Sequence, residues 1–303
     1  MCSNTKLITR KFATIASLYA LISLCAASVA LTESAFAFNV SSAGDWGCNS
    51  NTSNTVSKMS NKGPEVVLGL GDYSYADTAN CWFTVIKPID GKMHISIGNH
   101  DDGSSTLLNQ YLSHFGLTRQ YYSFNYGNAH FLALSTEMSS SSTQYDFAKA
   151  DLQKASQNSN IHWIIVFFHK PMYTSPGGHS ADSTIRSKYH PLFDQYNVDI
   201  VLFGHNHWYE RSYPLKYNSA NPGSPIKTTT ATKLYDNIDG TIFATVGTGG
   251  QSQYSYSSKA PFIVSQYKGY GFIDLSIGST TLAAKFYANS DGTIKDSFTI
   301  NKS

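Results

Sequence analysis

Side chains that metal ions accept as ligands follow five successive apolar runs of this sequence. Carboxylates, imidazoles, an amide and a phenol occur among them, and each of these groups can coordinate a metal ion. One such residue at the end of a strand is usually only a turn or capping residue. Five occurrences in order favour a shared site instead. In chain order the candidates are Asp45, Asp72 with Tyr75, Asn99 with His100 and Asp101, His169, and His205 with His207.

The apolar, β-branched runs that precede these residues are typical of strands buried on both faces. They span residues 38–44, 65–71, 92–98, 162–169 and 198–204. Helices are predicted between them over residues 52–61, 105–116, 143–158 and 183–197. Strands that alternate with helices predict an α/β layered fold. In an open α/β sheet, ligands bind outside the carboxyl ends of the strands, which is where the candidate residues lie.

Three later stretches, residues 121–137, 240–250 and 269–292, alternate or break at glycine turns as antiparallel hairpins do. We therefore expect a second sheet of mixed or antiparallel strands packed on the first. Residues 218–232 are rich in Pro, Ser, Thr and Asn without periodicity, and this composition predicts a long surface loop.

The N-terminus has the pattern of a secretory signal peptide. Lys6, Arg10 and Lys11 precede an apolar stretch from residue 12 to about residue 31, and the small-residue sequence Ala-Phe-Ala ends at Ala37. We predict cleavage after Ala37, so that residues 38–303 form one domain of a secreted or extracytoplasmic protein. The rival interpretation is an uncleaved membrane anchor, because a bilayer span needs only about 20 apolar residues. The Ala-Phe-Ala ending favours cleavage.

Charged residues make up 14% of the chain, and the formal net charge is +2. This balance is too even for binding driven by phosphate neutralisation, so no nucleic-acid partner is expected. No stable membrane partner is expected once the signal is cleaved. Outside the signal segment the cysteines are Cys48 and Cys81. Two cysteines in an oxidising compartment most often pair, with two unpaired buried thiols as the alternative.

The motifs DWG, GDYSY, GNHD, an apolar strand ending in His169, and GHNH occur in this order and resemble the calcineurin-like metallophosphoesterase superfamily. Tyr75, three residues after Asp72, and the WYER that follows His207 select the purple acid phosphatase branch. The resemblance covers residues 38–211. It implies an α/β/β/α sandwich, in which two mixed β-sheets pack face to face and are flanked by helices.

The resemblance also implies a site for two metal ions. The first set of ligands is rich in anionic oxygen and includes a phenolate, which suits ferric iron, Fe(3+). The second set has two imidazoles, an amide and a shared carboxylate, which suits a divalent ion such as zinc, manganese or ferrous iron. Carried over by motif, Asp45, Asp72, Tyr75 and His207 bind the first ion, and Asp72, Asn99, His169 and His205 bind the second.

The spacing of His205 and His207 suits two neighbouring ions. Residues i and i+2 of an extended chain face the same side, with their Cα atoms about 6.6 Å apart. Asn206 lies between them, faces away and need not be a ligand. The last three residues of WYER either support this histidine loop through hydrogen bonds or form a salt-bridged surface turn.

The implied reaction is hydrolysis of a small phosphate monoester by a metal-bound hydroxide, as in an acid phosphatase. His100 is the candidate general acid and phosphoryl contact, and Asp101 is the candidate partner of its other ring nitrogen. His179, ten residues beyond His169, lies where similar enzymes place another histidine near the phosphate. No GxSxG motif indicates a serine nucleophile. The remaining histidines are expected to be structural or surface residues: His94, His114, His130, His162 and His190.

Two other functions stay open at this point. A phosphodiesterase or nucleotide pyrophosphohydrolase would use the same metal site with a different substrate groove. A non-catalytic phosphate-binding or adhesion module would keep the fold without the full ligand set, and no ligand is missing here. The sequence does not fix the oligomeric state.

Overall fold

A computed structural model describes residues 37–303, and Phe38–Ser303 form one compact unit. Apart from its last residue, the predicted signal segment 1–37 lies outside the described residues. Within the described part of the chain, no helix combines the length and the apolarity that a membrane span requires.

Seven strands form the first sheet. β1, β2 and β3 pair in parallel, whereas β13, β14 and β15 extend the sheet with antiparallel pairs. The sheet is therefore mixed. Its order is β10 (Leu234–Asp236), β15 (Ile294–Asn301), β14 (Thr281–Ala288), β13 (Gly271–Ile277), β1 (Phe38–Ala43), β2 (Val66–Gly69) and β3 (Met93–Ile95).

The second sheet is also mixed. β5, β6, β7 and β11 pair in parallel, and β4, β8 and β12 join through antiparallel pairs. A two-residue strand, β9 (Ile226–Lys227), pairs with β8. The order is β12 (Ile263–Tyr267), β8 (Tyr209–Lys216), β11 (Thr241–Val246), β7 (Ile200–Phe203), β6 (Trp163–Phe167), β5 (Ala129–Ala133) and β4 (Tyr122–Tyr126).

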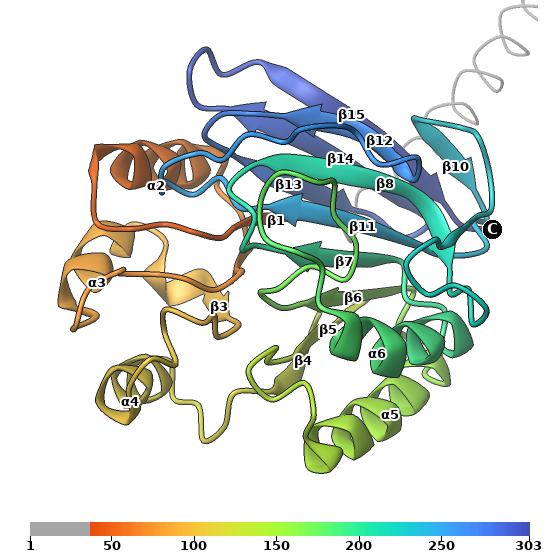
Figure 1. The fold of residues 1–303 in the computed structure, drawn as a ribbon, viewed down its shortest axis with the longest axis horizontal. Coiled ribbons are helices and arrows are strands. Elements are labelled where there is room, and N and C mark those ends of the chain that lie inside the picture. The colour runs from red at the N-terminus through yellow and green to blue at the C-terminus, as the bar shows by residue number, and fades with distance from the viewer. Residues whose placement is uncertain (1–36) are drawn as a thin grey trace, which may run out of the picture. The chain divides into compact units, whose positions relative to one another are not determined.

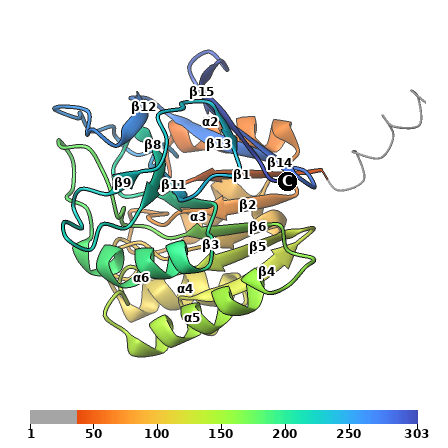
Figure 2. The same ribbon diagram turned by 90° about the vertical axis from the view of Figure 1, so that its right-hand side faces the viewer.

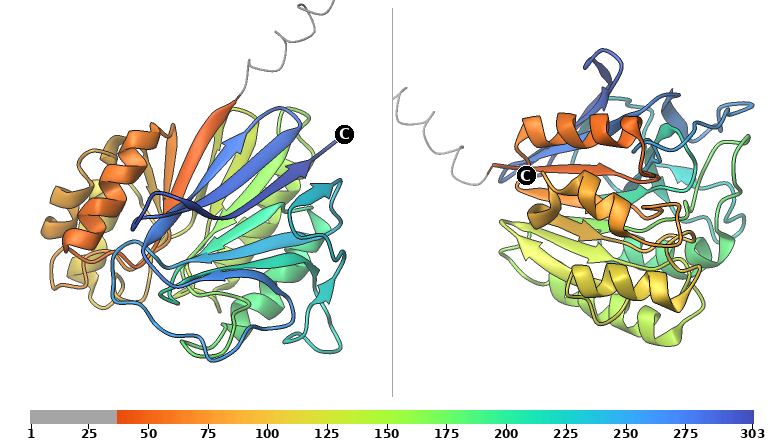
Figure 3. Two further views of the ribbon diagram at one scale, coloured as in Figure 1. Left: turned by 90° about the horizontal axis from the view of Figure 1, so that it is seen from above. Right: turned by 90° about the vertical axis from the view of Figure 1, so that its left-hand side faces the viewer.

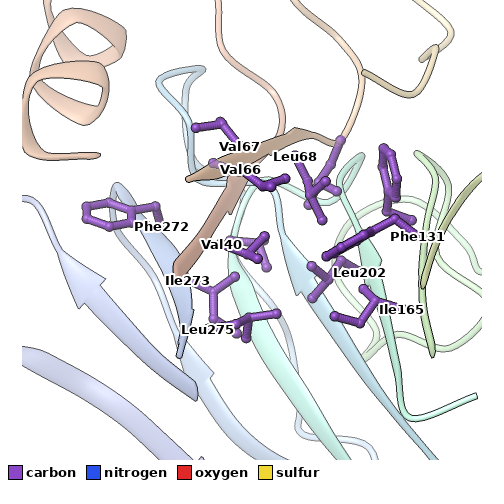
Figure 4. Close-up of a cluster of buried hydrophobic side chains, with 14 of the residues drawn as sticks. Val40, Val66, Val67, Leu68, Phe131, Ile165, Leu202, Phe272, Ile273 and Leu275 are labelled. Carbon is purple, nitrogen blue, oxygen red and sulfur yellow. The ribbon is translucent and has the colours of Figure 1, made fainter. Parts of the chain in front are cut away.

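The main hydrophobic core includes buried side chains from both sheets. On β7, Leu202 belongs to this core, whereas its neighbours Val201 and Phe203 belong to a second cluster on the other face. This alternation is the two-residue period of a strand. Figure 4 shows part of the main core, with Val40, Ile273 and Leu275 from the first sheet and Phe131, Ile165 and Leu202 from the second.

Helices cover the sheets on both sides. α5 (Ser142–Ser156) and α6 (Ser183–Gln195) pack on the outer face of the second sheet (Figures 1 and 2). α2 (Ser50–Lys62), α3 (Asn80–Ile86) and α4 (Ser105–His114) lie on the side of β1, β2 and β3 (Figure 3), and a single 3-10 turn, Asp90–Lys92, precedes β3. The predicted sandwich of two mixed sheets with flanking helices is thus confirmed.

The four predicted helices each begin at a side chain that caps free backbone N–H groups, as helix starts favour. These caps are Asn49, Ser104, Ser141 and Asp182. The sequence pattern did not predict α3, which has only seven residues. Its Trp82 is fully buried, so tertiary packing supports this short helix more than local propensity does.

Two features of the sheets differ from the prediction. The five buried strands do not share one sheet, because β1, β2 and β3 lie in the first sheet and β6 and β7 in the second. The segment that contains most of WYER begins the eight-residue strand β8 and is buried. It is therefore not a surface turn. Both differences arise from long-range pairing, which a local pattern does not specify.

Candidate metal centre

The carboxyl ends of β1, β2, β6 and β7 meet where the two sheets come together. The backbone N–H of Asp45 donates to the carbonyl of Gly71 at 3.0 Å, and that of Gly204 donates to the carbonyl of His169 at 2.9 Å. The ring nitrogen Nδ1 of His169 lies 2.8 Å from the carbonyl oxygen of Leu70, which links the second sheet to the first. Loops from both sheets therefore deliver their side chains to one place.

The four residues expected to bind the first ion meet at the Tyr75 hydroxyl. The Tyr75 hydroxyl is 3.2 Å from Oδ1 of Asp45 and 3.3 Å from Oδ2 of Asp72. Nε2 of His207 is 3.2 Å from the same hydroxyl and 3.3 Å from Oδ1 of Asp45. Three oxygen atoms and one nitrogen atom thus face one another, as the donor atoms of a metal site do.

The second expected set adjoins the first through Asp72. Nε2 of His169 lies 3.1 Å from Oδ2 of Asp72 and 3.2 Å from Nδ1 of His205. One ligand atom from each of Asp72, His169 and His205 lies within 4.8 Å of the others. Because Oδ2 of Asp72 contacts members of both sets, this carboxylate stands where a bridging ligand would.

Asn99, the remaining residue of the second expected set, precedes His100, whose backbone N–H donates to Oδ1 of Asp72 at 2.9 Å. The Oδ1 atom of Asn99 is buried and has no hydrogen-bond partner among the described residues. A buried carbonyl oxygen without a partner costs on the order of 1–3 kcal/mol. A cation would satisfy that oxygen, so the residues present fit a metal ion at this position.

Hydrogen bonds fix which ring nitrogen two of the histidines present. Nδ1 of His169 donates to the Leu70 carbonyl, and Nδ1 of His207 donates to the Ser252 carbonyl at 2.7 Å. Their Nε2 lone pairs are therefore free to face the site. Contacts of this type orient metal-binding imidazoles in proteins.

Four of the expected ligands have a backbone conformation that side chains disfavour. Among the described non-glycine residues, six have a positive φ, and four of these are expected ligands. A residue held in this region costs about 1–3 kcal/mol unless its surroundings determine it, and such residues cluster at functional sites. The four are Asp45 (φ 59°), Asp72 (φ 55°), Tyr75 (φ 52°) and His205 (φ 69°).

The Asp101 carboxylate binds the backbone of the loop that carries Asp72. One carboxylate oxygen accepts the backbone N–H groups of Asp72 at 2.8 Å and Gly98 at 2.9 Å, and the other accepts that of Tyr73 at 2.9 Å. No hydrogen bond within residues 37–303 joins this carboxylate to the His100 ring. Burial, followed by the nearby Asp72 carboxylate, raises the pKa of Asp101 to about 8. Asp101 therefore supports a ligand loop, whereas the sequence interpretation placed it against His100.

Gly98 allows the two ligand loops to approach closely. A methyl group at this position would collide with the carboxylate and the backbone nitrogen of Asp72. The glycine of GNHD is therefore required by packing against the ligand loop.

The charges of the site favour a cation. Burial, and then the carboxylates of Asp45 and Asp72, raise the pKa of the Tyr75 hydroxyl well above its usual range. A phenolate at this position therefore needs a strong positive charge beside it. Burial and the neighbouring His169 lower the pKa of His205 to about 2. His205 is therefore a neutral imidazole, which is the form that binds metal.

His100 lies at the solvent-facing edge of the site. Its ring contacts that of Tyr75 in a tilted arrangement, with centroids 4.4 Å apart, and its backbone N–H donates to Oδ1 of Asp72 at 2.9 Å. Beside these two rings is an open depression of about 430 Å³, whose lining also includes Asp77 and Ser104. The His100 side chain is exposed and can reach a molecule bound there.

His179 and Tyr254 form a second layer of rings over the expected ligands. His179 stacks on His205 with centroids 4.2 Å apart, and Tyr254 stacks on His207 at 4.0 Å. Nε2 of His179 lies 3.3 Å from the Tyr254 hydroxyl. The sequence interpretation included His179 but missed Tyr254, because nothing local distinguishes it from the other tyrosines of QSQYSYSS.

The residues of WYER divide between two tasks. The Tyr209 hydroxyl donates to Asp296 at 2.7 Å, and Nε of the fully buried Arg211 donates to the same carboxylate at 2.6 Å. Glu210 instead accepts the Thr174 hydroxyl at 2.6 Å and the Ser175 N–H at 3.0 Å. Of the last three residues, only Glu210 therefore bonds to a histidine loop, and that loop is the one that carries His179.

A disulfide joins Cys48 to Cys81, with Cα atoms 5.8 Å apart. The pairing expected from the cysteine count is confirmed. Cys48 lies three residues after Asp45, and Cys81 lies in α3, which follows the loop of Asp72 and Tyr75. The bond therefore ties together two of the ligand loops.

The remaining histidines make contacts with residues outside this cluster. His94 stacks on Phe124, and His114 pairs with Asp90 at the surface. The others are His130, which contacts Asp151, His190, which contacts Tyr173, and the exposed His162.

Sequence comparisons identify relatives of this chain. The profile of the calcineurin-like phosphoesterase family matches residues 42–209, more than half of the chain. An uncharacterized protein of Mycobacterium tuberculosis is 38% identical over 112 residues, which cover 36% of this chain and 21% of that protein. Purple acid phosphatase 23 of Arabidopsis thaliana is 25% identical over 239 residues, covering 64% of this chain and 52% of the relative.

A structural comparison supports the same fold. The purple acid phosphatase PPD1 from seeds of yellow lupin, Lupinus luteus, aligns with a TM-score of 0.78 at 24% identity. The alignment covers 88% of this chain and 54% of the lupin chain. This chain thus spans about half the length of the two purple acid phosphatases and about a fifth of the mycobacterial protein. The resemblance drawn from the motifs is confirmed.

Proposed function

This chain belongs to the calcineurin-like phosphoesterase family, and we propose that it is an acid phosphatase of the purple acid phosphatase type that hydrolyses small phosphate monoesters. The observation that carries the proposal is the convergence of seven ligand-type side chains from five strand ends on one place. No serine or cysteine nucleophile would be needed, because two bound ions would supply Lewis-acid charge that lowers the pKa of water and polarises the phosphoryl group.

We assign the seven side chains to two ions. The oxygen-rich set suits ferric iron, since only a strong Lewis acid offsets the raised pKa of Tyr75. The set that contains His169, His205 and the unpartnered Asn99 oxygen suits zinc, manganese or ferrous iron. The first set is Asp45, Asp72, Tyr75 and His207, and the second is Asp72, Asn99, His169 and His205.

The rim residues, which we define as His100, His179 and Tyr254, then act on the substrate. Hydrolysis forms a bond from a water oxygen to phosphorus and breaks the bond from phosphorus to the ester oxygen. His100 donates a ring N–H proton to the leaving ester oxygen, since its exposed ring borders the open depression. The attacking water gives up one proton to solvent, and the exposed His100 ring takes a proton back from solvent. The His179 ring and the Tyr254 hydroxyl, 3.3 Å apart, contact the phosphoryl oxygens from the other side.

We further propose that the protein acts outside the cytoplasm. The disulfide supports this placement because such bonds persist in oxidising compartments. The basic and apolar pattern of residues 1–37 supports export by a signal peptide.

A comparison of a monoester with a diester tests the function. Purified, metal-replete protein is assayed with p-nitrophenyl phosphate and bis(p-nitrophenyl) phosphate from pH 4 to 8. We expect a higher kcat/KM for the monoester, loss of activity in Asp72→Asn, and unchanged activity in Asp146→Asn, an exposed carboxylate of α5. A preference for the diester would identify a phosphodiesterase. Hydrolysis of neither ester would contradict an enzymatic role.

A further inference from the structure

Among the buried polar residues of the GHNHWYER segment that neither metal ion would use, Asn206 and Glu210 contact the loop that carries His179. We propose that Asn206 is a positioning residue, which fixes His179 against the metal centre by binding the backbone of the His179 loop (residues 171–182). This inference rests on the proposed function, because the ring so placed is the one assigned to the phosphoryl group.

Asn206 uses its whole side chain on this loop. Its Oδ1 accepts the backbone N–H of His179 at 2.7 Å, and its Nδ2 donates to the His179 carbonyl at 3.0 Å. Nδ2 also donates to the Thr174 hydroxyl at 2.9 Å. Because Asn206 is fully buried, water does not compete for these bonds, and losing them leaves unpaired polar groups.

Glu210 binds the same loop at Thr174 and Ser175, shortly before the glycines at 177 and 178. The Thr174 hydroxyl that accepts from Asn206 donates in turn to Oε1 of Glu210 at 2.6 Å. The backbone N–H of Ser175 donates to the same oxygen at 3.0 Å. A continuous chain of hydrogen bonds therefore runs from Asn206 through Thr174 to Glu210.

The loop has little freedom to move away from these anchors. A methyl group at Gly178 would collide with Oδ1 of Asn206 and with the ring of Trp208. On the opposite side, the backbone N–H of Ser257 donates to the carbonyl of Pro176 at 2.8 Å. The glycine is required because the loop backbone lies directly against Asn206.

The chain turns at this point and is not the extended segment that the sequence predicted, since His205 has a φ of 69° and the backbone N–H of Asn206 donates to the Gly204 carbonyl at 2.9 Å. This turn lets one segment serve both purposes. His205 and His207 face the expected ions, whereas Asn206 and Glu210 contact the His179 loop. The same eight residues therefore set both the ligand positions and the 4.2 Å stacking of His179 on His205. A shift of about 1 Å at such a position can cost on the order of a hundredfold in rate.

A double-mutant cycle tests whether Asn206 acts through His179. We expect Asn206→Ala to lower kcat/KM for p-nitrophenyl phosphate by roughly tenfold to a hundredfold in the otherwise unchanged protein. In the His179→Ala background the same change should lower it by less than about twofold, because the ring being positioned is gone. Metal content should stay at the wild-type ratio. Equal losses in both backgrounds, or metal loss that accompanies them, would overturn the proposal.

Hydrogen exchange gives a readout that does not depend on activity. The amide of His179 should exchange at least about tenfold faster in Asn206→Ala than in the wild type, and unchanged exchange would contradict the proposal.

Thr174→Val removes the bridging hydroxyl without touching the ligand turn. It should speed exchange of the same amide even if Asn206→Ala does not fold, while Thr184→Val, at the start of α6, should leave it unchanged. Wild-type protein that cleaves no ester would defeat the proposed function but leave the exchange test intact.

Discussion

The seven ligand-type residues and the three rim residues differ in how the chain holds them. All seven lie on loops that follow strand ends and that are bonded to one another, and four of the seven have a left-handed backbone. The rim residues lie on the loop that precedes α4, on the His179 loop and on the loop between β11 and β12, and His100 is exposed. The ligand positions are therefore determined by the packing of the two sheets, and the rim by contacts between loops.

This difference separates metal binding from substrate binding. A change among the ligand residues should remove metal and activity together. A change at the rim should leave the metal content intact and alter kcat or KM. The predictions for Asp72 and His100 would fail if the two groups did not divide in this way.

The largest effect is expected at Asp72, the carboxylate that contacts both ligand sets. Asp72→Asn should lower kcat/KM by at least about 10⁴-fold, because it removes the charge shared by the two sets. Elemental analysis of the purified variant should show loss of bound metal. A variant that retains both ions while losing activity would show that Asp72 belongs with the rim.

The disulfide should contribute next to the stability of the ligand loops. Replacing Cys48 and Cys81 together by Ser opens a loop of 33 residues, which should lower the free energy of unfolding by about 3–4 kcal/mol. Urea unfolding of the metal-free protein measures this loss without the contribution of bound metal. An unchanged unfolding midpoint would mean that packing alone holds the two loops.

At the rim, His100→Gln should lower kcat for p-nitrophenyl phosphate by about a hundredfold, as loss of a general acid does. Its metal content should equal that of the wild type. His114→Gln is the matched control, since His114 pairs with Asp90 at the surface, and its kcat should not change. Loss of metal in His100→Gln would remove the distinction between rim and ligand residues.

The smallest effect is expected from a histidine outside the site. Burial lowers the pKa of His94 to about 4, so the unfolded chain binds a proton near pH 6.5 while the folded chain does not. The free energy of unfolding should therefore fall as the pH drops from about 6.5 to 4. Uptake of one full proton on unfolding would give a slope of ~1.4 kcal/mol per pH unit. The expected slope is smaller, because the His94 ring is partly exposed to solvent. His94→Gln should flatten this slope in denaturant titrations, and an equally steep slope would assign it to other groups.

The motifs located side chains that the fold brings together, because each expected ligand follows a strand that a local pattern identifies. Asp45, Asp72 and His169 meet because carboxyl ends of strands converge, which requires no knowledge of the loops. The same pattern could not divide the strands between two sheets. An apolar run indicates that a strand is buried on both faces, but it does not specify which other strand it pairs with.

The contacts between the loops around this cluster were less predictable. Asp101 lies one residue after His100, yet its carboxylate binds the backbone of the Asp72 loop. Tyr254 reaches His179 across 75 residues of sequence, and Asn206 reaches the same loop from between two ligands. These contacts depend on how the loops fold over one another, and local spacing contains no signal of it.

The most direct test of the two-ion assignment combines metal analysis with a visible absorption spectrum. We predict two ions per chain, at least one of them iron, and a purple charge-transfer band from a Tyr75 phenolate on ferric iron. The band should disappear in Tyr75→Phe and persist in Tyr254→Phe, whose ring stacks on His207 while its hydroxyl contacts His179. A colourless, iron-free protein that still hydrolyses phosphate esters would contradict the assignment of ferric iron to Tyr75.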